Sequence, residues 1–160
     1  MNDPDIDDSP QETGVSPEVQ AMIGHLELQP HPEGGYYRET YRSESTLASG
    51  RATATSILFL IPKGVRSRWH RVDAEELWIY QAGAELDIRI TAEGTSCRTH
   101  RLGLCHGASP QILVPTNHWQ DACSRGDWTL VACLVTPGFR FEGFEMAEEG
   151  WEPESADQFS

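Results

Sequence analysis

The chain has 160 residues, with 25 Asp and Glu against 12 Lys and Arg, and its formal net charge is -13. A single domain of this length buries about two thirds of the surface that its unfolded chain exposes, so it can hold a core without disulfides or metals. The acidity disfavours a nucleic-acid polymer as a partner, and no apolar segment is long enough to span a bilayer.

The acidic side chains lie mainly at the two ends of the chain. Residues 1–37 hold eight acids and residues 141–160 hold seven, and neither segment contains Lys or Arg. The middle is slightly basic and stays compatible with a small anionic ligand. The four cysteines form no Cys-x-x-Cys pair, and the first residues carry no apolar secretory signal. These features favour reduced thiols and a cytoplasmic protein.

Composition divides the chain into three parts. Residues 1–15 are polar, acidic and punctuated by prolines, which predicts a disordered tail. Residues 16–149 contain the apolar patterns of a single domain, and residues 150–160 form a second acidic tail.

One short helix is predicted at the start of the domain. Ser16 is a favourable N-cap, and Pro17 suits the first helical position. Apolar residues then recur at helical spacing up to Leu26, so we expect an amphipathic helix over residues 17–26.

After Gly35 the apolar period changes to two, which indicates β-strands separated by turn signals such as "PKG", "SRGD" and "TPG". The expected strands are 36–42, 54–61, 66–72, 76–81, 85–91, 96–102, 111–115, 128–135 and 139–145. Short strands with only one early helix favour an all-β sandwich or barrel over alternating βαβ units.

The stretch "HPEGGYYRETYR" at residues 31–42 fits no simple core pattern. Its Gly-Gly pair permits a tight turn, and a strand follows. Alternation predicts two faces for this strand, namely Tyr37, Glu39 and Tyr41 against Tyr36, Arg38, Thr40 and Arg42. Because binding residues concentrate on loops and strand ends, Glu33, Tyr36 and Arg38 are candidate ligand contacts.

Two further segments combine apolar strands with polar side chains. In "GVRSRWHRVDAEELWIYQAG", residues 64–83, His70 and Glu76 lie on either side of a predicted strand-turn-strand, so their side chains can converge on one pocket. In "QILVPTNHWQDAC", residues 111–123, an apolar strand enters a proline turn and leaves through Trp119 and Gln120.

These two segments resemble the two conserved motifs of the cupin superfamily. The spacing from Gly64 through His70 and Glu76 to the next glycine fits the first motif, but Val72 occupies the position of its second histidine. Gln120 occupies the position of the histidine in the second motif. Two of the four usual metal ligands are therefore missing.

A narrower resemblance extends from about Val19 to Glu149. The segments "LQPHPEGGYYRETYRS", "ATSILFLI", "WHRVDAEELW", "LVPTNHWQ" and "LVTPGFRFEGFEM" are similar to a small cupin family of unknown function described as predicted sugar epimerases. The resemblance implies an all-β jelly roll, or double-stranded β-helix, similar in fold to deoxysugar-nucleotide epimerases. It also implies a homodimer.

The reduced ligand set disfavours tight metal binding. His70, Glu76 and Gln120 could form a weak, partly hydrated divalent-metal site, but no cofactor is required. Without a metal, His70 and Glu76 suit a general base and its partner. Tyr36, Tyr37 and Tyr80 are the candidates for the acid, with Tyr36 preferred.

Aromatic side chains supply the remaining candidate ligand contacts. Trp69, Trp119 and Tyr80 adjoin the motif segments and could stack on a ring-shaped ligand, although core packing is their default role. Phe139, Phe141 and Phe144 are expected in the core or in a dimer interface.

Three functions follow from these features. The first is an isomerase or epimerase acting on a carbohydrate-like, phosphorylated or nucleotide-linked small molecule. The second is a non-catalytic cupin that binds a planar ring such as a nucleobase. The third is a weakly metal-dependent isomerase or dioxygenase.

Overall fold

The computed structural model describes residues 14–154 and the backbone of residues 158–159. Most of the predicted N-terminal tail, residues 1–13, lies outside these residues. The elements are α1 (Pro17–His25), β1 (Gln29–Pro30), β2 (Tyr36–Arg42), β3 (Thr55–Pro62), β4 (His70–Val72), β5 (Glu75–Gly83), β6 (Leu86–Thr91), β7 (Arg98–Leu102), β8 (Gln111–Val114), β9 (Trp119–Ser124), β10 (Trp128–Thr136), the 3-10 helix η1 (Phe141–Gly143), β11 (Phe144–Met146) and β12 (Gln158–Phe159).

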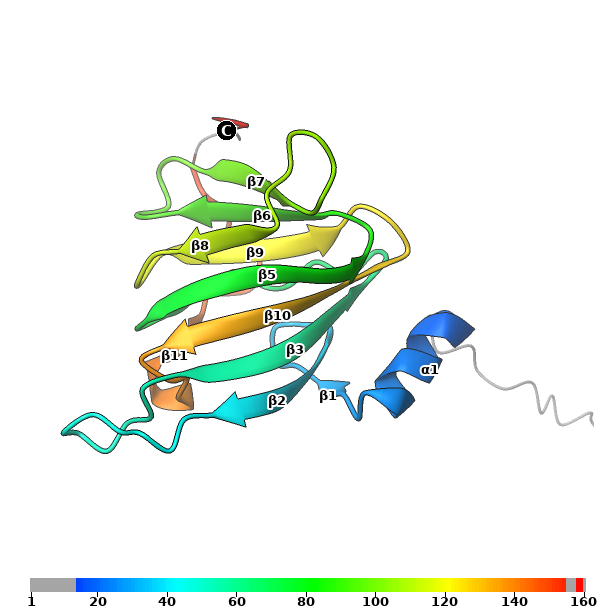
Figure 1. Cartoon of the computed structure of the whole chain (residues 1–160). Coiled ribbons are helices and arrows are strands. Elements are labelled where there is room, and N and C mark those ends of the chain that lie inside the picture. Colours follow the sequence, from blue (N-terminus) through cyan, green and yellow to red (C-terminus); the bar gives the residue numbers. More distant parts are fainter. Residues whose placement is uncertain (1–13, 155–157, 160) are drawn as a thin grey trace, which may run out of the picture.

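The strands form two six-stranded sheets, which confirms the predicted jelly roll. The first sheet has the order β1-β2-β3-β10-β5-β8, and the second has the order β11-β4-β9-β6-β7-β12. Figure 1 shows β2, β3, β10, β5 and β8 side by side. The pairs within the first sheet and between β4, β6, β7, β9 and β11 are antiparallel, and β12 pairs with β7 in parallel.

Period-two alternation places the core between the two sheets. Phe59 and Ile61 of β3, Trp78 of β5 and Ile88 of β6 are at most 1% exposed and belong to one apolar cluster. Successive strand residues point to opposite faces, so the intervening residues of β3 and β10 face outward. Burying each large apolar side chain contributes about 1.5–3 kcal/mol before entropy is counted, so this layer is the main source of stability.

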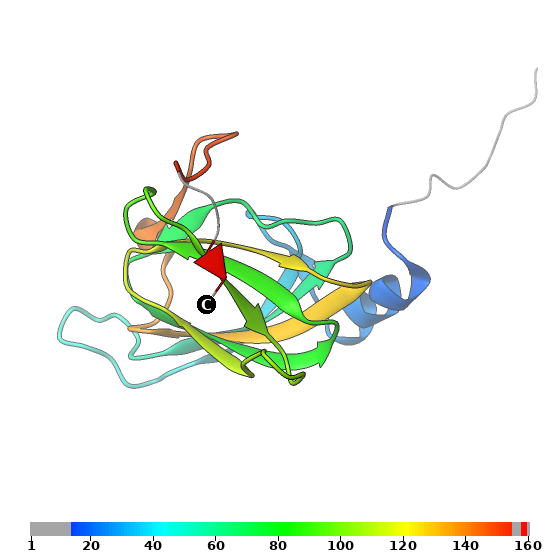
Figure 2. The ribbon, with the colours of Figure 1, turned by 90° about the horizontal axis from the view of Figure 1, so that it is seen from above.

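The predicted helix is confirmed, one residue shorter than expected. The side chain of Ser16 accepts a hydrogen bond from the backbone N–H of Val19 at 3.3 Å, and proline occupies the first turn. Val19 packs with Leu28 and Leu60 on the outside of the first sheet. Figure 2 shows α1 beside one end of the barrel.

Two predicted strands differ from the structure, and one observed strand, β9, was not predicted. In the expected strand 66–72 only β4 is regular, because the backbone N–H of Arg68 donates to the carbonyl of Glu33 at 2.7 Å instead of joining a ladder. The expected strand 139–145 is replaced by a turn, η1 and β11. The strand β9 was not predicted, because its Gln120 and Asp121 look solvent-exposed in sequence but are 1% exposed.

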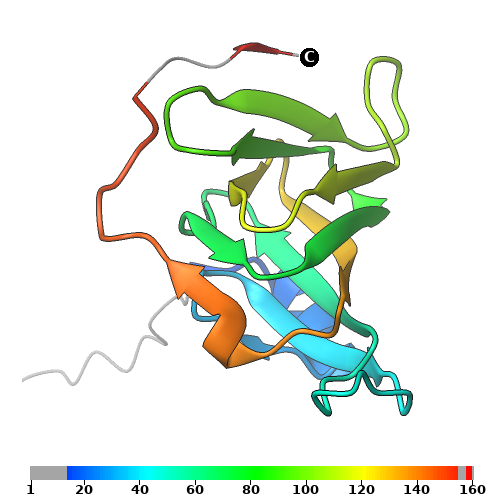
Figure 3. The same ribbon diagram turned by 90° about the vertical axis from the view of Figure 1, so that its left-hand side faces the viewer.

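After β11 the chain runs along the outside of the second sheet, as Figure 3 shows. The ring of Trp151 packs against those of Trp69 and Trp119, with centroids 5.6 Å and 5.1 Å apart. Glu152 forms an ion pair with Arg89 at 3.2 Å. The described part of the predicted C-terminal tail therefore contacts the barrel.

Among the described residues, no helix has the length and apolarity needed to cross a membrane.

Gly35 lies just before β2 and permits the backbone there to approach β3 closely. Its φ is +74°, and a Cβ there would lie 2.7 Å from the carbonyl oxygen of Leu60 and 2.9 Å from the ring of Phe59. We expect Gly35→Ala to lower the free energy of unfolding by about 1–3 kcal/mol more than Gly50→Ala, since overpacking adds that much to backbone strain. Gly50 is the matched control because its φ is +84° but nothing lies within 4 Å. Equal losses in urea unfolding would show that the crowding is relieved without cost.

Candidate functional site

A pocket of about 320 Å³ opens between the two sheets. Strands β2, β3, β5 and β10 supply one wall, and β4, η1 and β11 supply the other. Its lining residues are Gln29, His31, Glu33, Tyr37, Glu39, Arg42, Thr55, Ile57, Phe59, His70, Val72, Glu76, Cys133, Val135, Phe139, Arg140, Phe141 and Phe144. A pocket of this size suits a small ligand.

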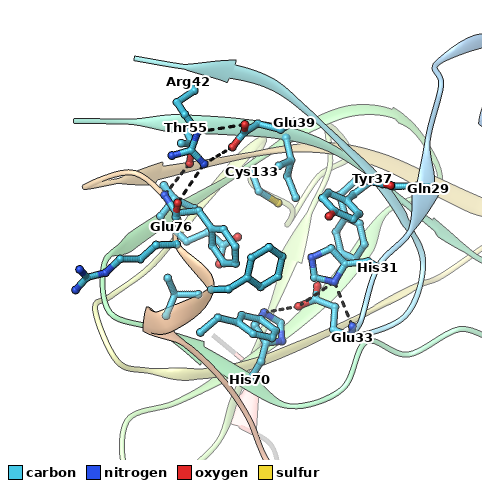
Figure 4. A pocket seen from close by; sticks show the side chains of 18 residues that line it. Gln29, His31, Glu33, Tyr37, Glu39, Arg42, Thr55, His70, Glu76 and Cys133 are labelled. Carbon is cyan, nitrogen blue, oxygen red and sulfur yellow. Dashed lines mark hydrogen bonds and ion pairs between the residues drawn. The ribbon is translucent and has the colours of Figure 1, made fainter. Parts of the chain in front are cut away.

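Glu33 and His70 form a buried ion pair in this pocket. The Nε2 atom of His70 lies 3.0 Å from a carboxylate oxygen of Glu33, and the two side chains are 3% and 5% exposed. Figure 4 shows Glu33 directed at the rings of both His70 and His31. The turn before β2 holds Glu33 here, because its carbonyl accepts the backbone N–H of Arg68 just before β4.

His70 is a cation at neutral pH. Burial by itself would lower the pKa of His70, but the charge and hydrogen bond of Glu33, together with Glu76, raise it to about 9. The Nδ1 atom also lies 2.7 Å from the carbonyl oxygen of Arg68. Since a carbonyl oxygen only accepts, Nδ1 carries a proton, and the second proton lies between Nε2 and the carboxylate. Both ring nitrogens therefore act as donors.

His31 is the neutral counterpart of His70. Burial lowers the pKa of His31, and the nearby Glu33 offsets only part of that effect. The Nδ1 atom accepts a hydrogen bond from the backbone N–H of Glu33 at 3.1 Å. In the neutral ring the proton must then reside on Nε2, which leaves His31 as a neutral hydrogen-bond donor.

Glu76 reaches the pocket from the first sheet, whereas His70 lies on β4 of the second sheet. It lies on β5, and its carboxylate accepts a hydrogen bond from the side-chain amide of Gln120. Burial raises the pKa of Glu76, although the positive charge of His70 works against this shift. Burial and the same carboxylate raise the pKa of the Cys133 thiol well above its ordinary range, so Cys133 is not an activated nucleophile. The protonated His70 and the carboxyl group of Glu76 thus come from facing sheets, the first from β4 and the second from β5.

The donor set does not fit the metal centre of a typical cupin. Both ring nitrogens of His70 are committed to acceptor oxygens, and the amide oxygen of Gln120 accepts the indole N–H of Trp78 at 2.8 Å. Val72 lines the pocket without a donor atom. Among the described residues, no cluster of three or more His, Cys, Asp or Glu side chains is arranged to hold a metal ion. These side chains therefore do not supply the set of ligands that a transition metal needs.

Aromatic rings line the mouth of the pocket. Phe139 lies 5.1 Å from Phe141 and 5.8 Å from Phe144 between ring centroids, and both contacts are edge-to-face. The ring of Phe144 also lies 5.5 Å from that of His70. Phe141 is 59% exposed, so it offers apolar surface to an entering ligand.

Some residues predicted for the site lie in the pocket. Glu33, His70 and Glu76 line it, and Gln120 supports Glu76 from behind. The raised pKa of His70 favours a donor role over the general-base role expected from the sequence.

The other candidates lie elsewhere. The predicted acid Tyr36 packs with the cluster beneath α1, and the hydroxyl of Tyr80 donates to the carbonyl of Gly83. Trp69 and Trp119 pack with Trp151 on the outside of the second sheet. Arg38 is also not among the lining residues. Tyr36 and Arg38 point away from the pocket because neighbouring strand residues alternate between faces. Tyr80 shares the face of Glu76 but lies farther along β5, where it packs against the apolar core.

Tyr37, one of the candidate acids, lies in the pocket, but sequence reasoning missed Glu39 and Arg42. Tyr37 and Glu39 lie on the inward face of β2, and a register shift between Glu39 and Tyr41 turns Arg42 to the same side. Such a bulge leaves no clear sequence signal. Phe139, Phe141 and Phe144 were expected in the core or in a dimer interface, and the structure places them along the pocket.

Comparison with known proteins agrees with this geometry. The model of the family described as Cupin superfamily (DUF985) matches residues 20–147. No curated protein sequence matches the chain significantly. A crystal structure of a Shewanella oneidensis protein is 38% identical, with a TM-score of 0.78 over 81% of this chain and 84% of that one.

Two further structures are similar. A hypothetical protein from Leishmania major is 29% identical, with a TM-score of 0.75 over 81% of this chain and 86% of that one. An oxalate decarboxylase from B. subtilis is 12% identical, with a TM-score of 0.57 over 74% of this chain and 29% of that one, and shares only the fold. The matching family model covers the chain from β1 to β11. The chain therefore belongs to the cupin superfamily, in the family DUF985.

Proposed function

We propose that the chain is a metal-independent isomerase or epimerase that moves a proton on a small carbohydrate-like substrate. The observation that carries this proposal is the set of acid–base groups in one pocket, with Glu76 on β5 of the first sheet, His70 on β4 of the second sheet, and Glu33 reaching His70 from the turn between β1 and β2. Epimerisation beside a carbonyl needs a base, a donor for the enolate and an acid on the opposite face.

The environment of each group supports a division of roles. Burial raises the pKa of Glu76 toward the range in which a carboxylate is an effective base. The neutral His31 carries its proton on Nε2 and can donate it to the enolate oxygen. Both N–H groups of His70 are already donated, to Glu33 and to the carbonyl of Arg68, so the proton returned to carbon would be the one that His70 and Glu33 share.

The proposal requires no metal because the committed nitrogens of His70 and the missing ligand at Val72 leave too few donors. The predicted homodimer stays a prediction and is tested by sedimentation of the purified chain.

Solvent deuterium exchange tests the catalytic claim. The purified protein is incubated in heavy water with a panel of aldoses, ketoses and their amino and phosphorylated derivatives, and proton NMR follows loss of a carbon-bound proton. We expect exchange into at least one member, reduced by roughly 10²- to 10⁴-fold in Glu76→Gln because general acid–base groups contribute that much.

Glu75→Gln is the matched control, because Glu75 is the exposed neighbour on the same strand. It should leave the exchange rate unchanged. A member that binds by thermal shift but exchanges no proton, in wild type as in Glu76→Gln, would remove the catalytic role.

The aromatic mouth favours a second candidate, a binding protein for a planar ring. Phe139, Phe141 and Phe144 offer stacking surfaces that a non-catalytic role would use equally well. Selective thermal stabilisation by nucleobases, without stabilisation by sugars, would support this function.

A further inference from the structure

The buried part of the pocket holds two carboxyl groups, and one of them, Glu76, has no ion-pair partner among the described residues. Glu33, Glu76 and His70 are 5%, 7% and 2% exposed, so two carboxyl groups face one imidazolium away from water. His31 does not change this balance, because burial lowers its pKa and favours the neutral ring. Glu76 itself accepts a hydrogen bond from a neutral amide rather than from a cation.

The arginines that line the pocket are already paired. Arg42 donates to Glu39 at 2.6 Å and to the carbonyl of Phe139 at 3.2 Å. Arg140 donates to Asp73 at 2.9 Å, but Asp73 also accepts from Arg51 at 2.7 Å. Arg42 therefore has a carboxylate of its own, whereas Arg140 shares one, and because the Arg140 side chain is 49% exposed, solvent weakens its attraction for a bound anion.

The walls of the pocket also suit a cation. Phe59, Tyr37 and the three phenylalanines at the mouth present ring surfaces, and a cation near the face of an aromatic ring gains about 0.5–2 kcal/mol. A volume of about 320 Å³ limits the ligand to about one ring with its substituents.

We infer that the pocket binds a small, single-ring compound carrying a protonated amino group, with the ammonium held by Glu76 and Glu33 and the ring held by the aromatic mouth. This inference uses the pocket of the proposed function and narrows its carbohydrate-like substrate to an amino-bearing one. It favours amino-bearing substrates over the phosphorylated and nucleotide-linked ones expected from the sequence.

Two charge series test the inference. The first is benzylamine, benzyl alcohol and benzoate, and the second is glucosamine, glucose and a hexose phosphate. In each series the ring is kept while its charge changes from positive to neutral to negative. Isothermal titration calorimetry at neutral pH and low salt is expected to show the ammonium member of at least one series binding about tenfold or more tightly than its neutral analogue, which is about 1.4 kcal/mol.

Variants identify the groups responsible. Glu76→Gln should remove most of the preference for the ammonium member, while Glu75→Gln, on the exposed side of the same strand, should retain it. Glu33→Gln should reduce the preference less than Glu76→Gln does, because His70 loses its positive charge in the same variant. Circular dichroism of each variant establishes that it is folded.

The outcomes are decisive in both directions. The inference is overturned if the neutral or anionic members bind as tightly as the amines, if no amine binds, or if the preference survives in Glu76→Gln. If glucosamine binds selectively but shows no deuterium exchange, this inference stands and the proposed catalytic function is removed.

Discussion

Replacing Glu33 by Gln is expected to lower the pKa of His70 from about 9 to its ordinary value of 6.5 or below. Burial is the largest influence on this ring and lowers its pKa, and the carboxylate of Glu33 counters it through both charge and a hydrogen bond. An amide keeps the shape of the side chain but lacks the negative charge, so burial should prevail. An NMR titration of the His70 ring protons measures the change.

The same pair predicts how stability depends on pH. Because the folded-state pKa of His70 is raised, its contribution is complete below about pH 6.5 and is lost as the pH rises through about 9. The shift corresponds to about 3 kcal/mol. Glu33→Gln should therefore be less stable than wild type at pH 6, and the difference in unfolding free energy should shrink toward pH 10.

Glu39→Gln is the control for both measurements. Glu39 also lines the pocket, but its carboxylate pairs with Arg42 and not with His70. The titration of His70 should be unchanged in this variant. A His70 pKa near 9 in Glu33→Gln would show that another group keeps the ring charged.

Asp121→Asn is expected to cost about 3–5 kcal/mol of unfolding free energy, because removing one partner leaves a charge buried without compensation. Asp121 is 1% exposed on the outside of β9 and forms ion pairs with Arg66 and Arg89. The pKa of Arg89 is raised by the hydrogen bonds that it donates to Asp121, so this guanidinium is held as a cation. Its remaining partner, Glu152, is 57% exposed and compensates weakly.

Denaturant unfolding measures this loss, with Asp127→Asn as the matched control. Asp127 and its partner Lys63 are 80% and 77% exposed and lie 3.7 Å apart, so their pair should contribute little. If both variants unfold at the same urea concentration, the charge cluster on the second sheet contributes nothing to stability.

Much of the fold could be predicted from alternating patterns. The strand Tyr36–Arg42 has the predicted bounds, and β6 and β10 differ from prediction by one residue at one end. β6 alternates apolar and polar residues because one of its faces packs on the core, and β10 is a longer, mostly apolar run. The strand Trp119–Ser124 could not be found this way. Its buried polar residues accept hydrogen bonds from residues distant in sequence, such as Arg89 and Trp78, and the local pattern does not show these partners.

The candidate site was predicted where spacing carried the signal. Motif spacing predicted His70 and Glu76. Glu33 was predicted because it lies next to the Gly-Gly turn in a stretch that fits no simple core pattern. Spacing could not decide which side chains on the adjacent strands point into the pocket. Tyr36 and Tyr37 are adjacent, and only the pairing of β2 with β3 shows that Tyr37 faces the pocket.

The role of His70 was also beyond the sequence. Its charge depends on Glu33, which lies 37 positions earlier in the chain but only 3.0 Å away in the fold. The spacing that identifies a histidine therefore does not decide whether it acts as base, acid or metal ligand, since neighbouring charges set its pKa.

The central claim is that His70 is a doubly protonated donor in an acid–base site and not a metal ligand. The nitrogen chemical shifts of its ring at pH 7, recorded before and after addition of Zn²⁺ or Mn²⁺, test this claim most directly. We predict that both nitrogens have the shifts of protonated atoms and that neither metal changes them at stoichiometric concentration. A neutral ring with one unprotonated nitrogen, or loss of a ring proton on adding metal, would contradict the account.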